Sequence, residues 1–575
     1  MTVGPLPRTA QIAALLIGAM LTIPFLLPFA QPPIASFYQE WLTMALGAAA
    51  FVLLATGAAR ISVPFVCLLP LMLIALLGVH TVTGRLAFSE QGVIAGLYLV
   101  WTGVMVMAGQ LLRQSLGGER LVILFAWVIG AGALASALIA GLQMAGWTPA
   151  GWPTLDPHGR VQGNLNQPNH LADYLAIGIA STIFLAATRR LRAGAAALAL
   201  ALMLPALWFS GSRAAVFYLG LLLIGSLWLR ARIASPEFGR AAIWMTAIAL
   251  TFVMLAWLGP MTTDSSAHGA SAIDSRFGLE DAGLDLRLRK WHAALLMAEK
   301  SPVLGVGFGA YGWHYFLLAP RLPAEVEGLA TDHAHNLLLH LLAEFGVFAA
   351  LACAVVALVW LHAQRRAGAS PAAAWLWAAT GIVLLHSGLE HPLWFAYFLG
   401  LFSLLVGASW PENWSLGALR GGLTTAGVAG LVALGLLWLV MSDYRQLERL
   451  ARPVEGESPA ALQARVVDAY QRTLFPHLLV FALASGATVD DEQLEAKIAL
   501  NATALRVLPT PEAAYRHAVL LALAGRTDAA RRAWDRASAA YPRAVPAAVR
   551  ALDSDARAPI ALLLEYARSK IGTRD

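Results

Sequence analysis

Charged side chains are scarce in this sequence. Asp, Glu, Lys and Arg make up 13% of its 575 residues, hydrophobic residues make up 58%, and the mean hydropathy is +0.65. Soluble domains carry about 25% charged residues. The composition therefore excludes an ordinary soluble domain and predicts a polytopic membrane protein.

Cysteine is also nearly absent. The 2 cysteines, Cys67 and Cys353, lie in separate apolar runs and form no C-x-x-C pair and no zinc-binding pattern. The sequence therefore excludes a disulfide framework and predicts packing roles for both. The net charge of +6 comes largely from arginines between the apolar runs, so it gives no support to nucleic-acid binding.

The apolar runs are long enough to cross a membrane. A hydrocarbon core of about 30 Å requires roughly 20 apolar residues in a helix, and these runs have roughly 17 to 25. Because lipid cannot satisfy backbone polar groups, the runs must be helices. The sequence predicts an all-α membrane protein with about 13 spans, at 11–30, 40–58, 62–79, 91–112, 121–145, 169–187, 193–209, 214–229, 241–259, 335–361, 373–389, 392–408 and 421–441.

Arginine predicts the orientation of these spans, because short cytoplasmic loops carry an excess of Lys and Arg. Alternate connections hold Arg8, Arg60, Arg113, Arg120, Arg189, Arg190, Arg192, Arg230, Arg232, Arg240, Arg365, Arg366 and Arg420. Apart from the long segment 260–333, the opposite connections hold only Arg85, Arg160 and Arg213. We therefore expect a cytoplasmic N-terminus, a first span retained as a signal anchor, and an extracytoplasmic loop 260–333 and C-terminal tail.

The sequence changes character after residue 441. The tail is charged and alanine-rich, and Pro511–Pro542 predicts two amphipathic helices on either side of Gly525. This pair resembles a tetratricopeptide-type hairpin, although such arrays usually need about three repeats. The sequence predicts a membrane domain over 1–441 and a small helical domain over 442–575, which serves as a scaffold or docking surface without chemistry of its own.

The polar clusters of the membrane region fall at the outer ends of the predicted spans or in the outer loop. They are Gly163–Tyr174, Ser210–Arg213, Asp285–Trp291, Leu304–Tyr311, Thr331–Gly346 and His386–Trp394. Polar groups are costly inside a membrane and usually serve a function there. Their gathering on one side predicts a single outward-facing cavity.

Each of these clusters also has a structural interpretation. Asn166, Gln167 and Asn169 could cap the start of a helix. Arg213 could be an arginine that snorkels to the membrane interface. Arg287 lies in a charge-rich loop and could belong to a solvated face.

The histidines have alternatives as well. His335 could be a satisfied histidine at a helix end, or it could bind a metal ion together with His333. The nearby Asp332 has no further ligand at metal-site spacing, so the sequence predicts no metal site. Glu390 and His391 could simply pair with each other at the interface.

Several of these motifs recur together in a known family. They are Q-P-N-H-L-A-D-Y, the S-G-S-R turn, the R-x-x-x-W of Arg287 and Trp291 followed by G-V-G-F-G, and His335-Asn336 followed after nine residues by Gly346. In this combination the sequence resembles the Wzy/WaaL superfamily of O-antigen polymerases and ligases. G-N-L-N-Q-P-N-H and the H-S-x-x-E-x-P-L-W-x-A-Y-F of His386–Phe398 most resemble its PglL-type bacterial protein O-oligosaccharyltransferases.

The resemblance covers roughly residues 150–410 and implies a GT-C-like, inverting, metal-independent glycosyltransferase of the bacterial inner membrane. The implied donor is a glycan preassembled on undecaprenyl diphosphate, and no nucleotide sugar or cofactor is implied. The implied acceptor is a Ser or Thr hydroxyl of a periplasmic protein such as a pilin.

The chemistry of such a transfer assigns roles to three residues. A diphosphate leaving group needs cations, and the planar guanidinium group binds phosphate oxygens well. We therefore expect Arg213 and Arg287 to stabilise the departing diphosphate. A hydroxyl acceptor needs a base to take its proton, and His335 is the candidate.

The family motifs also imply roles for neighbouring residues. The resemblance implies that Gln167, Asn169 and Asn336 hydrogen-bond the substrate or organise the pocket. It further implies that Glu390 orients a partner or the acceptor.

Three alternative functions stay open. An O-antigen ligase would attach the same donor to lipid A core, and a Wzy-type polymerase would extend a polysaccharide. Both would share the histidine and the arginines. A transporter would show ionisable residues or broken helices near the membrane midplane, whereas the polar groups here gather at the outer ends.

Overall fold

A computed structural model describes residues 7–30, 32–262, 282–322, 331–412, 414–452, 458–555 and 557–571. The chain forms two compact units. Unit 1 comprises Met1–Leu71, Tyr98–Asp281 and Val355–Met441, and unit 2 comprises Met72–Leu97, Ala282–Ala354 and Ser442–Asp575. Parts of the predicted outer loop, residues 263–281 and 323–330, lie outside the described residues.

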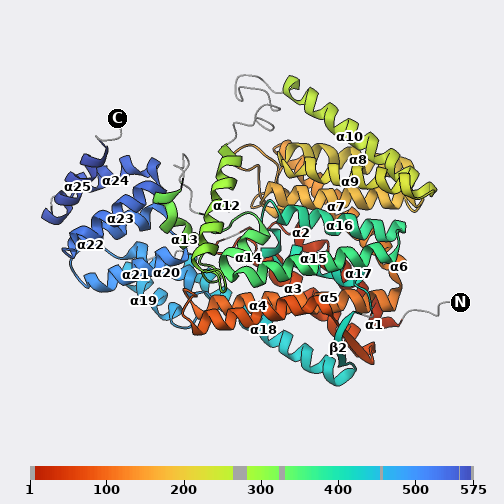
Figure 1. The fold of residues 1–575 in the computed structure, drawn as a ribbon, viewed down its shortest axis with the longest axis horizontal. Coiled ribbons are helices and arrows are strands. Elements are labelled where there is room, and N and C mark those ends of the chain that lie inside the picture. The colour runs from red at the N-terminus through yellow and green to blue at the C-terminus, as the bar shows by residue number, and fades with distance from the viewer. Residues whose placement is uncertain are drawn as a thin grey trace. The chain divides into compact units, whose positions relative to one another are not determined.

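The described residues are almost all helical, which confirms the predicted all-α class (Figure 1). Unit 1 contains α1 (Arg8–Met20), α2 (Ile23–Leu26), α3 (Phe37–Gly57), α6 (Gly118–Met144), α7 (Pro168–Ala187), α8 (Ala193–Phe209), α9 (Ala214–Arg232), α10 (Pro236–Thr262), α16 (Pro371–Ser387), α17 (Ala396–Ser409) and the short strands β1 (Arg60–Pro64) and β2 (Ser415–Arg420). Unit 2 contains α12 (Ala282–Lys300), α13 (Tyr311–Leu318), α14 (Leu337–Phe345), α19 (Pro459–Tyr470), α20 (Pro476–Gly486), α21 (Leu494–Val507), α22 (Pro511–Leu523), α23 (Thr527–Ala540), α24 (Val545–Asp553) and α25 (Ala558–Ile571). Residues of both units occur in α4 (Leu68–Val82), α5 (Ser89–Leu116), α15 (Val347–Ala367) and α18 (Leu423–Ala451).

Among the described residues, 10 helices are long and apolar enough to cross a membrane. Helices α8 and α16 have 17 residues each and α17 has 14, so they are shorter than these. Each has an apolar sequence and coincides with a predicted span. The chain is thus a multi-pass membrane protein, and the larger number of about 13 spans stays a prediction.

Helix α7 forms the centre of unit 1. All of its residues except Asn169 are buried, and it packs against α6, α8, α9, α10 and α16. Its Tyr174 ring stacks on Phe25 with 4.1 Å between ring centroids, and the Tyr174 hydroxyl donates a hydrogen bond to the carbonyl of Leu21. Gly132 of α6 makes room for this hydroxyl, because a Cβ there would lie 2.0 Å from it. The predicted site residues Gln167 and Asn169 therefore lie at the start of a tightly packed helix.

Connections that the arginine pattern assigns to the same side lie together in unit 1. Strands β1 and β2 pair antiparallel, with Arg60 opposite Arg420. At connections assigned to the other side, the Gln39 side-chain amide donates a hydrogen bond to the carbonyl of Asn164 at 3.1 Å. These two contacts agree with the prediction that successive connections lie on alternate sides of the membrane. The compartment on each side stays a prediction.

The predicted span 335–361 is two helices, not one. Helix α14 ends at Phe345, the following Gly346 has φ +85°, and α15 begins at Val347. A Cβ at Gly346 would lie 2.2 Å from the carbonyl oxygen of Val303, so a neighbouring backbone passes too close for any other residue. The apolar run continues across this glycine, and for that reason hydropathy alone does not reveal the break.

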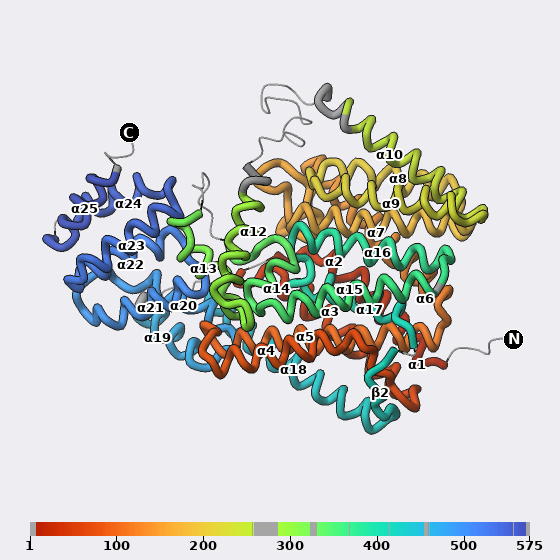
Figure 2. Tube along the Cα trace, in the orientation of Figure 1, coloured from red at the N-terminus to blue at the C-terminus, as the bar shows by residue number. Residues whose placement is uncertain are grey.

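The C-terminal tail of unit 2 is helical from α19 to α25 (Figure 2). Helices α22 and α23 lie side by side and meet at Gly525, as the sequence predicts for this pair. Trp534 and Tyr515 pack edge to face inside their core, and Phe316 and Ala319 from the predicted outer loop belong to the same core. The loop and the tail thus share one hydrophobic core. That the tail is a tetratricopeptide-type domain bounded at residue 441 stays a prediction.

The packing of α6 on α7 can be tested with two glycines of α6. Replacing Gly132 with alanine should lower the free energy of unfolding by about 1–3 kcal/mol, because the added Cβ overlaps the Tyr174 hydroxyl. Gly130→Ala is the matched control, since its Cβ would lie 3.7 Å from Ser181. Thermal unfolding in detergent should show a lower midpoint for Gly132→Ala alone. Equal midpoints would contradict the close approach.

Candidate functional site

The predicted site residues belong to both units. Gln167, Asn169, Arg213 and Glu390 lie in unit 1. Arg287, His335 and Asn336 lie in unit 2.

In unit 1, helix α7 begins with a side-chain cap. Asn166 is left-handed with φ +54°, and Gln167 is extended. The Gln167 side-chain oxygen accepts a hydrogen bond from the His170 N–H at 2.6 Å, and Pro168 occupies the first turn. Gln167 therefore caps the helix, which is the structural role that the sequence allows for it. A role toward a substrate stays a prediction.

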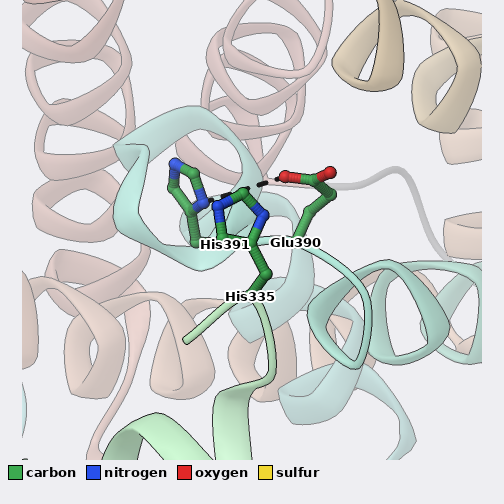
Figure 3. A group of neighbouring side chains, drawn as sticks. All are labelled: His335, Glu390 and His391. Carbon is green, nitrogen blue, oxygen red and sulfur yellow. Dashed lines mark ion pairs between the residues drawn. The ribbon is translucent and has the colours of Figure 1, made fainter. Parts of the chain in front are cut away.

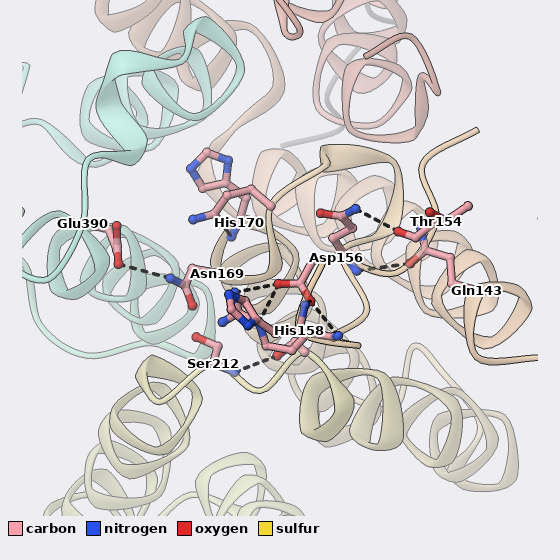
Figure 4. Close-up of polar contacts among 12 residues, drawn as sticks. Gln143, Thr154, Asp156, His158, Asn169, His170, Ser212 and Glu390 are labelled. Carbon is pink, nitrogen blue, oxygen red and sulfur yellow. Dashed lines mark hydrogen bonds and ion pairs between the residues drawn. The ribbon is translucent and has the colours of Figure 1, made fainter. Parts of the chain in front are cut away.

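Two polar pairs join α7 to the end of α16. The Asn169 side-chain amide donates a hydrogen bond to Glu390 Oε1 at 3.1 Å (Figure 4). One turn further along α7, Asp173 Oδ2 lies 2.8 Å from His386 Nδ1, and both side chains are 0% exposed. The Glu390 N–H donates to the His386 carbonyl, so the helical turn continues through both residues. Because residues four apart lie on the same helix face, the two pairs form consecutive rungs between the segments.

Sequence reasoning did not assign a role to Asp173 or His386. Both occur in motifs that it singled out, and each lies four residues from a predicted site residue, Asn169 or Glu390. This shared spacing of four residues is the sequence signal that indicates a second contact between α7 and the end of α16. Among the described residues, neither Asp173 Oδ1 nor His386 Nε2 has a hydrogen-bond partner, so the pair satisfies only one atom of each group.

Glu390 also approaches a histidine of its own turn. Its Oε2 lies 4.0 Å from His391 Nδ1 (Figure 3), which agrees with the predicted pairing of these two residues. Glu390 is 8% exposed. Its carboxylate thus lies between Asn169 and His391 in a largely buried place.

The connection that leads into α7 is held by its own polar groups. The Gln143 side-chain oxygen accepts a hydrogen bond from the N–H of Gly163, and Asp156 forms a 2.7 Å ion pair with Arg160 (Figure 4). Partial burial raises the pKa of the Asp156 carboxyl, but hydrogen bonds from Arg160 outweigh it and hold that pKa below its ordinary value. Arg160, one of the predicted outward cations, is therefore neutralised within its own loop.

Arg213 immediately precedes helix α9. It follows Gly211, whose φ of +62° allows the tight S-G-S-R turn. A Cβ at Gly211 would lie 2.8 Å from the Arg160 side chain, so the turn packs closely against the connection that precedes α7. Arg213 is half-buried and is held at a fixed helix start.

In unit 2, His335 and Asn336 form the same local structure as Asn166 and Gln167. His335 is left-handed with φ +52°, and Asn336 is extended. The Asn336 side-chain oxygen accepts a hydrogen bond from the Leu339 N–H at 3.1 Å and caps α14. Figure 3 shows the His335 side chain on the connection that leads into this helix. A left-handed histidine is strained, and such strain is often found at functional positions.

The glycine-rich run G-V-G-F-G packs against the end of α14. The Val306 N–H donates to the Ala343 carbonyl at 2.8 Å, and the Gly307 N–H donates to the Glu344 carbonyl at 3.1 Å. A Cβ at Gly305 would lie 2.2 Å from the backbone of Glu344. The first glycine is therefore required by the close approach of two backbones.

The Glu344 side chain of α14 binds the backbone just after this run. Its Oε1 accepts a hydrogen bond from the Tyr311 N–H at 3.1 Å, and its Oε2 lies 3.3 Å from His340 Nε2. His340 in turn accepts a hydrogen bond at Nδ1 from the Ala334 N–H, next to His335. A chain of buried polar contacts thus connects the glycine-rich run to the segment that carries His335.

Arg287 lies on helix α12, and this differs from the expected charge-rich loop. Helix α12 packs against α14, and Arg287 is half-buried on it. Two residues later, the Arg289 guanidinium lies 5.4 Å from the centre of the Tyr315 ring. The Tyr311 hydroxyl donates to the Lys290 carbonyl at 2.7 Å. These contacts hold α12 against α13 and give Arg287 a rigid support.

Comparison with known proteins identifies similar families over three parts of the chain. Residues 162–186 match the protein glycosylation ligase family, residues 198–354 match the O-antigen ligase family, and residues 374–553 match the C-terminal region of the virulence factor membrane-bound polymerases. The general O-oligosaccharyltransferase of Acinetobacter baylyi is 25% identical over 456 residues, which cover 75% of this chain and 76% of the relative. The matched regions include every predicted site residue.

The Asp173–His386 pair can be tested by a double-mutant cycle. Asp173→Leu should lower the free energy of unfolding by about 3–5 kcal/mol, because it leaves the buried His386 without its partner. Asp173→Leu combined with His386→Leu should recover part of this loss, since two apolar side chains leave no polar group unpaired. Thermal unfolding of the purified variants measures both effects. Losses that simply add would show that the two residues do not interact.

Proposed function

We propose that the chain is an O-oligosaccharyltransferase of the PglL-type branch of the Wzy/WaaL superfamily, a family of glycosyltransferase-type ligases. The proposed reaction transfers a glycan from undecaprenyl diphosphate to a Ser or Thr hydroxyl of a periplasmic protein such as a pilin. The observation that carries this proposal is the match to the protein glycosylation ligase family over 162–186. This segment holds the capped start of α7 and the rungs to α16.

In the proposed reaction, the hydroxyl oxygen of the acceptor attacks the anomeric carbon of the first sugar. The bond from that carbon to the phosphate oxygen breaks, and its electron pair leaves with undecaprenyl diphosphate. His335 receives the hydroxyl proton. Attack opposite the leaving group inverts the anomeric carbon, and no step requires a metal ion.

Arg213 and Arg287 are proposed to stabilise the negative charge that develops on the diphosphate. Guanidinium groups suit this role because they present parallel N–H donors to phosphate oxygens and stay charged. Each arginine is half-buried on or at the start of a helix, which limits the entropy lost when it binds.

The three amide residues and Glu390 are proposed to organise the pocket. Gln167 and Asn336 do so by capping the helices that they precede. Asn169 holds the Glu390 carboxylate, and Glu390 is proposed to orient the acceptor. The site is proposed to open to the periplasmic side of the inner membrane, with the tail on the same side.

Two alternative acceptors have their own support. The O-antigen ligase match over 198–354 favours lipid A core, and the polymerase match over 374–553 favours a growing polysaccharide. The deciding experiment expresses the chain with a lipid-linked oligosaccharide pathway, a candidate acceptor protein and lipid A core. Mass spectrometry should find the glycan on Ser or Thr of protein. Glycan on lipid alone would replace the proposal with the ligase.

The arginine roles predict large losses of activity. Arg213→Ala and Arg287→Ala should each raise the barrier by about 2.7–4 kcal/mol, which is roughly a 100- to 1,000-fold loss of transfer, as for other charge-stabilising donors. The double variant should lose less than the product of the single losses, because both arginines serve the same step. Transfer rates with purified donor and acceptor measure this.

Arg472→Ala is the matched control for the arginine variants. Arg472 is exposed and pairs with Asp468 on the surface of the tail, so its removal should leave transfer unchanged. Losses that multiply fully in the double variant would contradict a shared role for Arg213 and Arg287.

The role of His335 is best tested with asparagine. Asparagine adopts the left-handed conformation readily, so His335→Asn should keep the turn and the midpoint of thermal unfolding while it removes the base. We expect transfer to fall about 100- to 10,000-fold. EDTA treatment of the wild-type protein should leave its rate unchanged, which separates a base from a metal ligand. Full activity of His335→Asn would reject the assignment.

A further inference from the structure

Unit 2 contains a polar cavity that the proposed transfer reaction does not use. Its volume is about 260 Å³, and Arg85, His314 and Arg506 contribute the charged or titratable part of its lining. Arg85 comes from the turn between α4 and α5, His314 from α13, and Arg506 from the end of α21. Gly309 and Trp313 also line the cavity. Segments far apart in the sequence thus bring cations to one cavity.

Arg85 is fixed within this cavity by its own contacts. Its guanidinium donates hydrogen bonds to the Gly305 carbonyl and, at 3.0 Å, to the Ser301 hydroxyl. Neither partner is an anion, so these contacts hold the arginine in place without neutralising it. Arg506 is exposed, and the cavity lining contains no carboxylate.

The charges around His314 affect its protonation state. Burial lowers its pKa to about 4, and the nearby Lys300, Arg506 and Arg85 act in the same direction, while Glu344 opposes them. At neutral pH the imidazole is therefore uncharged and can donate one hydrogen bond. The two arginines supply the positive charge.

We propose that this cavity binds a phosphate-type oxyanion, carried by a sugar or by a lipid headgroup. Two guanidinium groups and a neutral imidazole would donate to its oxygens, and charge-assisted hydrogen bonds of this kind are the strong ones. The Trp313 side chain in the lining supplies an apolar surface beside the charged group. The cavity is slightly smaller than sites for drug-sized ligands, which begin at about 300 Å³, so it suits one phosphate with an attached sugar or glycerol.

The contribution of Arg506 offers a clean test, because this residue is exposed and its side chain can be removed without opening the core. Binding of inorganic phosphate and of N-acetylglucosamine 1-phosphate to the purified full-length chain is measured by ³¹P NMR line broadening. Arg506→Ala should weaken both affinities by about tenfold or more, and Arg506→Lys should weaken them less. Arg526→Ala is the control, since Arg526 pairs with Glu495 on the same tail and does not line the cavity.

The source of the oxyanion is distinguished by the membrane that surrounds the chain. In nanodiscs, loss of sugar phosphate binding with phosphatidylglycerol but not with phosphatidylcholine would assign the cavity to a lipid headgroup. Binding that persists in both would assign it to a sugar. Wild-type affinity no higher than that of Arg506→Glu would overturn the proposal. The assay contains neither glycan donor nor acceptor, so its result is independent of the proposed transfer reaction.

Discussion

The buried contact between Asp173 and His386 is the constraint on which the arrangement of unit 1 depends. Lipid offers no partner to polar side chains, and an unpaired polar group in an apolar interior is costly. The 2.8 Å contact between these fully buried side chains therefore fixes the rotation and register of α7 against α16. The same register places Asn169 beside Glu390 one turn away. A polar contact deep in the bundle thus determines the position of a carboxylate at its end.

The sequence predicts the helices of the membrane region well, because the requirement to satisfy the backbone in lipid leaves one solution for each long apolar run. It fails at Gly346, where the apolar pattern continues through a break. The break arises from contact with the backbone of Val303, which no local pattern reports. It also misassigns Arg287 to a loop, because charged residues alternate with the apolar ones at the start of α12 and the helix is stabilised by packing against α14 and α13.

In the candidate site, the sequence identifies residues of interest but not the residues that they contact. Sequence motifs identify Asn169 and Glu390, but their hydrogen bond joins residues 221 positions apart. The Asp173–His386 pair spans 213 positions and lies inside two motifs that attracted attention for other residues. In the G-V-G-F-G run, the N–H groups of Val306 and Gly307 bind carbonyls of α14, because Gly305 lets the two backbones approach closely. A sequence motif thus shows which residue types a site needs, but it does not show which distant residues they contact.

The Asn166-Gln167 and His335-Asn336 segments explain why certain residue pairs occur before α7 and α14. The first residue of each has φ of +54° or +52°, and the second has nearly the same dihedral angles, −157° and 115° in Gln167 and −159° and 117° in Asn336. In both segments the second side chain caps the following helix. The left-handed residue turns the chain sharply just before the cap, so its side chain is held by a rigid helix start. Asparagine and histidine are among the non-glycine residues that tolerate this conformation best. Capping therefore explains the asparagine of the His-Asn motif. The turn does not require an imidazole group, so the local backbone structure does not explain the histidine.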